Sequence, residues 1–187
     1  MNFGSMVFAK EPIFIIAGEK QSGKTSFLLQ LLRMLDNAGL TTAGFVSLHQ
    51  PADDSYTLRN IQTQEEARLM QRIAGFKEHP HHFELFPEGI KTGMHWIQQI
   101  LDKHPDIAVI DEIGSYELSG ELWCEDFTRL VNAPSSLIFT TKTKHVEAIM
   151  ERWDIEPAAI FYPDDFAFPE QAFEQIKNVL QTLPKRL

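Results

Sequence analysis

Two patterns of hydrophobic and polar positions alternate along this chain. Runs rich in apolar and β-branched residues, typical of strands covered on both faces, occur at 12–17, 41–48, 107–110, 135–141 and 158–163. Between them apolar residues recur at helical spacing, which predicts helices from Lys24 to near Gly39, from about Glu88, and over about 123–130, 146–153 and 169–180. Strands alternating with helices predict an α/β fold, with a mostly parallel central sheet flanked by helices.

The segment 50–90 has the least regular pattern. It predicts a turn over 51–55, a weaker strand over 56–61 and a short strand over 81–86, whereas 64–72 fits either a short helix or an irregular excursion. The helix near Glu88 should bury a face of Ile90, Met94, Ile97 and Leu101. No linker interrupts the chain, so we expect one domain over 1–187, with 50–90 as an insert or lid and 1–11 disordered or vector-derived.

Composition and charge narrow the classes of partner. The 187 residues suffice for one well-buried domain. A net charge of −9, from 26 acidic and 17 basic residues, argues against a nucleic-acid partner, which needs clustered Lys and Arg. No apolar stretch approaches a membrane span, and the first residues lack the features of a signal peptide. The single cysteine, Cys124, excludes an internal disulfide and predicts a cytoplasmic location.

A phosphate-binding motif follows the first predicted strand. The sequence GEKQSGKT matches G-x-x-x-x-G-K-[ST] at Gly18, Gly23, Lys24 and Thr25. By average usage the pattern arises by chance in about one chain per hundred of this length. The motif also follows a strand and opens a helix, where backbone N–H groups and the helix dipole attract anions. A plain strand-to-helix turn would need the glycines but has no use for Lys24 and Thr25.

This loop supplies most of the predicted site. Lys24 would reach the β- and γ-phosphates as the charged catalytic group, and the Thr25 hydroxyl would bind Mg²⁺. The backbone and side chains expected around the phosphates are Gly18, Glu19, Lys20, Gln21, Ser22, Gly23, Lys24, Thr25 and Ser26.

A second stretch, IAVIDEIG, places two carboxylates after a buried strand. Asp111 would lie at the mouth of a parallel sheet and bind Mg²⁺, and Glu112 would polarise a water as the catalytic base. Strands also often end in solvated acids, so the two carboxylates carry weight only together with the phosphate loop. Glu117 fits either an outer partner of the metal or water, or an acid near a helix start.

Together GEKQSGKT and DEIGSYEL resemble the small nucleoside-triphosphatases typified by a thermophile enzyme and its human cancer-related homologue. The segments TTAGFVS, HHFELFPEGI and LIFTT are also similar, so the resemblance covers most of the chain loosely. It implies a RecA-like P-loop domain that slowly hydrolyses ATP, GTP and other nucleoside triphosphates with Mg²⁺. It also implies phosphate binding by 18–25, metal binding by Thr25 and Asp111, and a catalytic base at Glu112, with Glu117 matching the family's last acid.

The chain departs from that family at three places. Ser115 and Tyr116 stand where a less bulky pair including Met is usual. HQPADDSYTLRN replaces a basic, glycine-containing hairpin, and TKTKH at 141–145 replaces a stretch with different neighbours. These changes leave phosphate binding in place and put base preference and turnover in question.

Other chemistry-bearing residues have weaker cases. TKTK at 141–144 lacks the Asp of a guanine-reading loop, although its lysines could approach a nucleotide. His79, His81 and His82 lack a fourth ligand at a suitable spacing for a metal site. Cys124 has no evident partner histidine, which favours a half-buried thiol. Candidates for an arginine finger, each also consistent with simple solvation, are Arg59, Arg68, Arg72, Arg129 and Arg152.

Three functions fit these motifs. The leading hypothesis is Mg²⁺-dependent hydrolysis of nucleoside triphosphates, slow and broad in base preference. A small-molecule or nucleotide kinase would use the same site with an acceptor hydroxyl in place of water, and 50–90 could then form the acceptor pocket. A nucleotide-binding regulatory module would use the nucleotide to stabilise one conformation.

Overall fold

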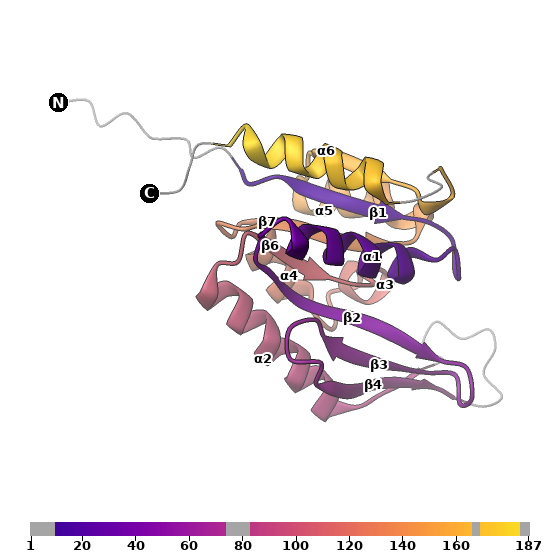
Figure 1. Ribbon diagram of the computed structural model, residues 1–187. Coiled ribbons are helices and arrows are strands. Elements are labelled where there is room, and N and C mark those ends of the chain that lie inside the picture. Colours follow the sequence, from indigo (N-terminus) through magenta and orange to yellow (C-terminus); the bar gives the residue numbers. More distant parts are fainter. Residues whose placement is uncertain (1–9, 74–82, 166–168, 184–187) are drawn as a thin grey trace.

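The computed structural model describes residues 10–73, 83–165 and 169–183, which contain one eight-stranded sheet (Figure 1). Its order is β5-β4-β3-β2-β6-β7-β1-β8. The strands are β1 (Ile13–Ala17), β2 (Thr42–Gln50), β3 (Ser55–Asn60), β4 (Glu66–Arg72), β5 (Phe83–Leu85), β6 (Ile107–Ile110), β7 (Ser136–Thr141) and β8 (Ala159–Phe161). Neighbours from β2 to β8 pair in parallel, and β3, β4 and β5 extend the sheet in antiparallel fashion.

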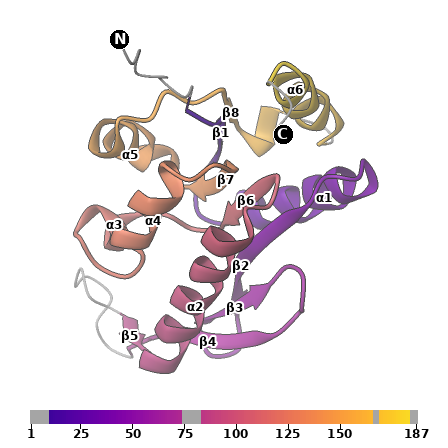
Figure 2. The same ribbon diagram turned by 90° about the vertical axis from the view of Figure 1, so that its left-hand side faces the viewer.

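Helices cover both faces of this sheet, as Figure 2 shows edge-on. One face carries α1 (Lys24–Asn37) and α6 (Glu170–Gln181). The other carries α2 (Pro87–Lys103), α4 (Cys124–Val131) and α5 (Val146–Trp153), with the single turn α3 (Ser115–Leu118) beside α4. Short 3₁₀ turns are η1 (Thr143–His145) and η2 (Pro163–Asp165). The predicted α/β fold with a mostly parallel, helix-flanked sheet is confirmed.

Each face has its own hydrophobic core, because side chains of successive strand residues point to opposite sides. On β1, Phe14 and Ile16 pack toward α1 and α6, whereas Ile13 and Ile15 pack toward α2, α4 and α5. All four are at most 5% exposed. This double coverage explains why the strand reads as an unbroken apolar run.

The segment 64–72 contains a strand, contrary to the prediction from the sequence. The helix or irregular excursion expected there is wrong, because β4 is a strand that pairs with β3 and β5. Only Leu69 of β4 is fully buried, on the face that α2 covers. Pairing with strands distant in sequence therefore decides this segment, and its own side chains carry no clear period of two.

The buried face of α2 also differs from the expected one. Met94 is 46% exposed, whereas Trp96, Ile97 and Ile100 are buried. The helix is turned so that Gly93 meets the Trp123 ring, where a Cβ atom would lie 2.4 Å from a ring carbon. Close approach of a large aromatic ring at a glycine is a packing effect that apolar spacing alone does not reveal.

The parallel strands bring one set of loops to a single edge of the sheet. The segments after β1, β6 and β7 all leave this edge, and β3 begins and β4 ends beside it. Such an edge is where open α/β sheets bind ligands. Among the described residues, no helix has the length and apolarity needed to cross a membrane.

Candidate functional site

The phosphate loop, residues 18–25, connects β1 to α1 and has the backbone that an anion cradle needs. Gly23 begins α1 with φ of 80°, a left-handed conformation that glycine adopts without strain. The Gly18 N–H donates to the Thr141 carbonyl at 3.2 Å, which fixes the loop against the end of β7. Glu19, Lys20, Gln21 and Ser26 are exposed, and Ser22 is half-buried.

Lys24 lies inside this loop with only 4% of its surface exposed. Its Nζ donates to the carbonyls of Gly18 at 3.2 Å and Glu19 at 2.9 Å. It also lies 3.6 Å from Glu112 Oε1. The ammonium group is therefore positioned between the phosphate loop and the segment after β6.

Asp111, 2% exposed, is held by hydrogen bonds from three elements. Its Oδ2 accepts from the Thr25 hydroxyl at 2.9 Å and the Ser47 N–H at 3.0 Å. Its Oδ1 accepts from the Thr140 hydroxyl at 2.5 Å. Burial, and then the nearby Glu112 charge, raises the Asp111 pKa to about 6, and these hydrogen bonds oppose the rise.

Glu112 follows Asp111 with a left-handed backbone, φ of 66°. Its N–H donates to the Thr140 hydroxyl at 2.8 Å, so the same hydroxyl holds both consecutive acids. The Glu112 side chain keeps 36% of its surface exposed. A positive φ at a non-glycine residue carries strain that a surrounding network must stabilise.

The Thr25 hydroxyl and the Asp111 carboxylate offer oxygen ligands, which suit a hard divalent cation bound by few protein groups. No group of three or more His, Cys, Asp or Glu side chains suited to a metal occurs among the described residues. The Thr25 hydroxyl and Asp111 Oδ2 are 2.9 Å apart, close to the spacing of two adjacent ligands in an octahedron with bonds of about 2.1 Å. Mg²⁺ typically takes few protein oxygens and keeps waters and phosphates as its other ligands.

Glu117 lies at the start of α3, where its Oε2 accepts the Gly114 N–H at 2.8 Å. The residue is 2% exposed, and its Oε1 has no hydrogen-bond partner of ordinary geometry within the described structure. Burial raises the pKa of Glu117 to about 7, although backbone amides, that of Gly114 foremost, oppose the rise.

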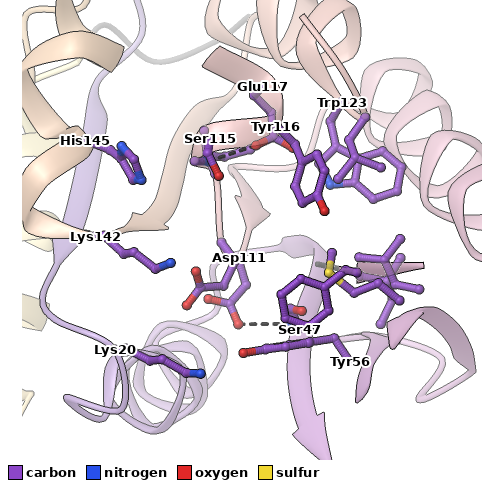
Figure 3. Close-up of a pocket in the computed structure, with 18 of the residues that line it drawn as sticks. Lys20, Ser47, Tyr56, Asp111, Ser115, Tyr116, Glu117, Trp123, Lys142 and His145 are labelled. Carbon is purple, nitrogen blue, oxygen red and sulfur yellow. Dashed lines mark hydrogen bonds between the residues drawn. The ribbon is translucent and has the colours of Figure 1, made fainter. Parts of the chain in front are cut away.

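A cavity of about 330 Å³ opens beside these acids (Figure 3). Its polar end is lined by Lys20, Lys142 and His145 with Asp111 and Glu112. Its other end is aromatic and apolar, with walls from β3, β4, β5 and the α3–α4 segment. Burial, and then the charges of Lys144 and Lys142, lowers the pKa of His145.

The structure therefore brings Lys24, Thr25, Asp111 and Glu112 together at one sheet edge. Sequence reasoning missed the Thr140 hydroxyl and the Ser47 N–H, although a polar residue near the carboxyl end of a predicted parallel strand was a usable signal for Thr140.

The other candidate residues from the sequence differ in whether they line the cavity. Lys142 and His145 line the cavity, whereas Lys144 is exposed. Cys124 is half-buried and accepts from Arg152 Nη2 at 3.4 Å. Of the candidate arginines only Arg72 lines the cavity, and it is ion-paired with Asp54. His79, His81 and His82 lie outside the described residues, as do residues 1–9.

Comparison with known proteins identifies this arrangement. Residues 13–162 match the NTPase family. The fold is similar to the crystal structure of THEP1 from the hyperthermophile Aquifex aeolicus (TM-score 0.64, 15% identity, 92% of this chain and 99% of that one). It is also similar to the solution structure of a human cancer-related nucleoside triphosphatase (TM-score 0.59, 17% identity, 95% and 100%). No curated protein matches the sequence. Since the match spans most of its length, the chain belongs to the NTPase family and is a nucleoside-triphosphatase.

Proposed function

We propose that this enzyme hydrolyses nucleoside triphosphates to diphosphate and phosphate in a Mg²⁺-dependent reaction at the edge formed by the phosphate loop and the segment after β6. The observation that carries the proposal is the convergence at one sheet edge of two contacts, the Lys24–Glu112 ion pair at 3.6 Å and the Thr25–Asp111 hydrogen bond at 2.9 Å. Charge neutralisation and positioning are the main contributions that a protein makes to phosphoryl transfer.

Each residue has a distinct role in this proposal. The loop N–H groups and Lys24 bind phosphate oxygens, and Lys24 exchanges its two carbonyl partners for them. Thr25 and Asp111 would hold Mg²⁺, which when bound would neutralise charge on the β- and γ-phosphates. Glu112 orients the attacking water and accepts its proton. Glu117 supports this region from α3, as an outer partner of the water or metal.

Slow turnover and broad base preference are part of the proposal. Among the described arginines only Arg72 lines the cavity, and Asp54 already pairs with it. A finger arginine supplies about 10³–10⁵ in rate in related systems, so the lack of an unpaired arginine among the described residues of the cavity predicts slow hydrolysis. Lys142 gives partial compensation at the polar end of the cavity. No guanine-reading [NT]-K-x-D sequence occurs, which favours several bases as substrates.

The test measures phosphate release from ATP, GTP, CTP and UTP, with Mg²⁺ or with EDTA and without any added acceptor. We expect slow release from all four that stops in EDTA. Glu112→Gln should lower kcat by about 10²–10⁴ while leaving KM within a few-fold. Glu125→Gln, an exposed acid of α4, is the matched control and should behave as wild type. An unchanged rate in Glu112→Gln would remove Glu112 from the mechanism.

A further inference from the structure

The cavity is larger than hydrolysis requires. One attacking water needs about 30 Å³, whereas the cavity holds about 330 Å³, within the usual range of small-molecule sites. The phosphate loop contributes only Lys20 to its lining. If the terminal phosphate lies at Glu112, as the proposed function requires, the nucleoside of the bound triphosphate extends away from the cavity. The part of the cavity beyond Asp111 and Glu112 is then free for a second molecule.

The end of the cavity away from Asp111 and Glu112 has aromatic walls that suit a flat ring. Tyr56, Phe83, Tyr116 and Trp123 line it, and Figure 3 shows Tyr116 and Trp123 across from Tyr56. Tyr56 and Phe83 pack edge-to-face with centroids 5.7 Å apart, and the Arg72 guanidinium lies 4.8 Å from the Phe83 centroid. Aromatic walls of this kind bind planar groups by stacking and edge contacts.

The acidic side chains that line the cavity would orient a bound ligand. Glu117 lines the wall beside Tyr116 and Trp123. Backbone amides, that of Gly114 foremost, hydrogen-bond its carboxyl group, which fixes Glu117 as part of this wall. At the other end the half-exposed Glu112 carboxylate faces the position of the terminal phosphate, so a ligand hydroxyl there would lie beside a base.

We propose that this cavity is an acceptor site for a nucleoside-like molecule, a heteroaromatic ring with a primary hydroxyl, to which the enzyme transfers the terminal phosphoryl group. The inference rests on the proposed function for its phosphate donor. The acceptor hydroxyl oxygen forms a bond to the γ-phosphorus as the bond to the β–γ bridging oxygen breaks. Glu112 takes the hydroxyl proton, and the nucleoside diphosphate leaves with the bonding electron pair. The products are a phosphomonoester and a diphosphate.

Binding is tested on the full chain by calorimetric titration with adenosine, guanosine, cytidine and uridine, with and without Mg-ADP. At least one ribonucleoside should bind with a Kd at or below about 1 mM while Mg-ADP is present. Met70→Trp, which fills the apolar end, and Phe83→Ala, which removes a wall, should each weaken binding by about tenfold or more. Met94→Trp, the same change at an exposed position of α2, is the control.

Transfer is tested by incubating Mg-ATP with the same ribonucleosides and measuring the nucleoside monophosphate by mass spectrometry. We expect its formation, with the same loss in Met70→Trp and Phe83→Ala. If no ribonucleoside binds, if Mg-ATP releases phosphate but bound ribonucleoside receives none, or if neither cavity variant weakens binding, the inference is overturned. If ribonucleosides bind but Mg-ATP gives neither phosphate nor monophosphate, the proposed function fails instead.

Discussion

The Thr140 hydroxyl sits between the two adjacent acids of the site. It donates to Asp111 Oδ1 and accepts the Glu112 N–H, so one side chain sets the direction of both carboxylates. Its neighbour Thr141 is also buried, but its hydroxyl has no hydrogen-bond partner among the described residues. Of these two consecutive threonines of β7, only Thr140 has a hydroxyl that hydrogen-bonds the acids of the site, because successive side chains of a strand point to opposite faces.

Replacing Thr140 with valine should damage the site specifically. Thr140→Val keeps the shape but removes the hydroxyl that pairs with Asp111 Oδ1 and the Glu112 N–H, so we expect hydrolysis to fall by about 10- to 100-fold and unfolding free energy by about 1–3 kcal/mol. Steady-state kinetics and urea denaturation measure the two effects. Thr141→Val removes an unpartnered hydroxyl and should be neutral or stabilising, and equal losses in both variants would contradict the role of Thr140.

Glu117 should make stability depend on pH. Its folded pKa of about 7 lies above the ordinary value of 4.5, so the folded state binds more protons than the unfolded state between these pH values. Stability contributed by the neutral acid is therefore complete below about pH 4.5 and is lost as pH rises through 7. Glu117→Gln should raise unfolding free energy at pH 8 by up to about 3 kcal/mol and change it little at pH 5.

Denaturation of wild type and Glu117→Gln across pH 5–8 provides the measurement. Asp111, whose pKa is also raised, remains in both proteins, so the difference between them isolates Glu117. A difference that is constant with pH would contradict the raised pKa of Glu117.

At the scale of elements, the parallel contact of β2 with β6 builds the site. Gly44 of β2 pairs with Val109 of β6, and this register brings the Ser47 N–H to Asp111 Oδ2. Gly44 has φ of 149°, and a Cβ there would lie 1.9 Å from the Val109 carbonyl oxygen. Close backbone approach, for which only glycine has room, thus determines whether β2 can reach the acid.

Gly44→Ala should therefore separate the two strands. We expect a loss of at least about 3 kcal/mol of unfolding free energy, since neither the backbone conformation nor the space suits a side chain. Gly39→Ala is the matched control, because Gly39 also has a positive φ, 83°, but has open space around it. It should cost only about 1 kcal/mol, and thermal denaturation that ranks the two variants equally would contradict the steric argument.

At the scale of the whole molecule, the nucleotide site joins elements from distant parts of the chain. The phosphate loop follows β1, Ser47 lies on β2, Asp111 follows β6 and Thr140 lies on β7. A ligand bound across these elements exists only in the folded state, so its binding free energy adds to the stability of the entire domain.

A Mg-triphosphate should therefore raise the melting temperature. At about 100 times its Kd a slowly hydrolysed Mg-triphosphate analogue adds about 2.7 kcal/mol, which corresponds to roughly 5–10 °C for a chain of this size. Lys24→Ala should abolish most of this shift, whereas Lys91→Ala, an exposed lysine of α2, should retain it. Differential scanning calorimetry decides, and a full shift in Lys24→Ala would contradict the role of Lys24 in phosphate binding.

The sequence by itself determined the features that are formed by residues contiguous in the chain. The loop 18–25 is contiguous, and its glycines, lysine and threonine have their chemistry wherever a strand precedes them and a helix follows. The unbroken apolar runs of β1 and β6 likewise define strands that are buried on both faces. Because Asp111 directly follows β6, the run of β6 also places this acid at the sheet edge.

Only the tertiary structure decided the rest, because those features depend on contacts between segments far apart in the chain. β4 is a strand through its pairing with β3 and β5, and α2 is rotated by the contact of Gly93 with Trp123. Thr140 and the Ser47 N–H become partners of Asp111 only when three parallel strands align. The aromatic cavity has walls from β3, β4 and β5 and from the α3–α4 segment, and no local pattern encodes such a space.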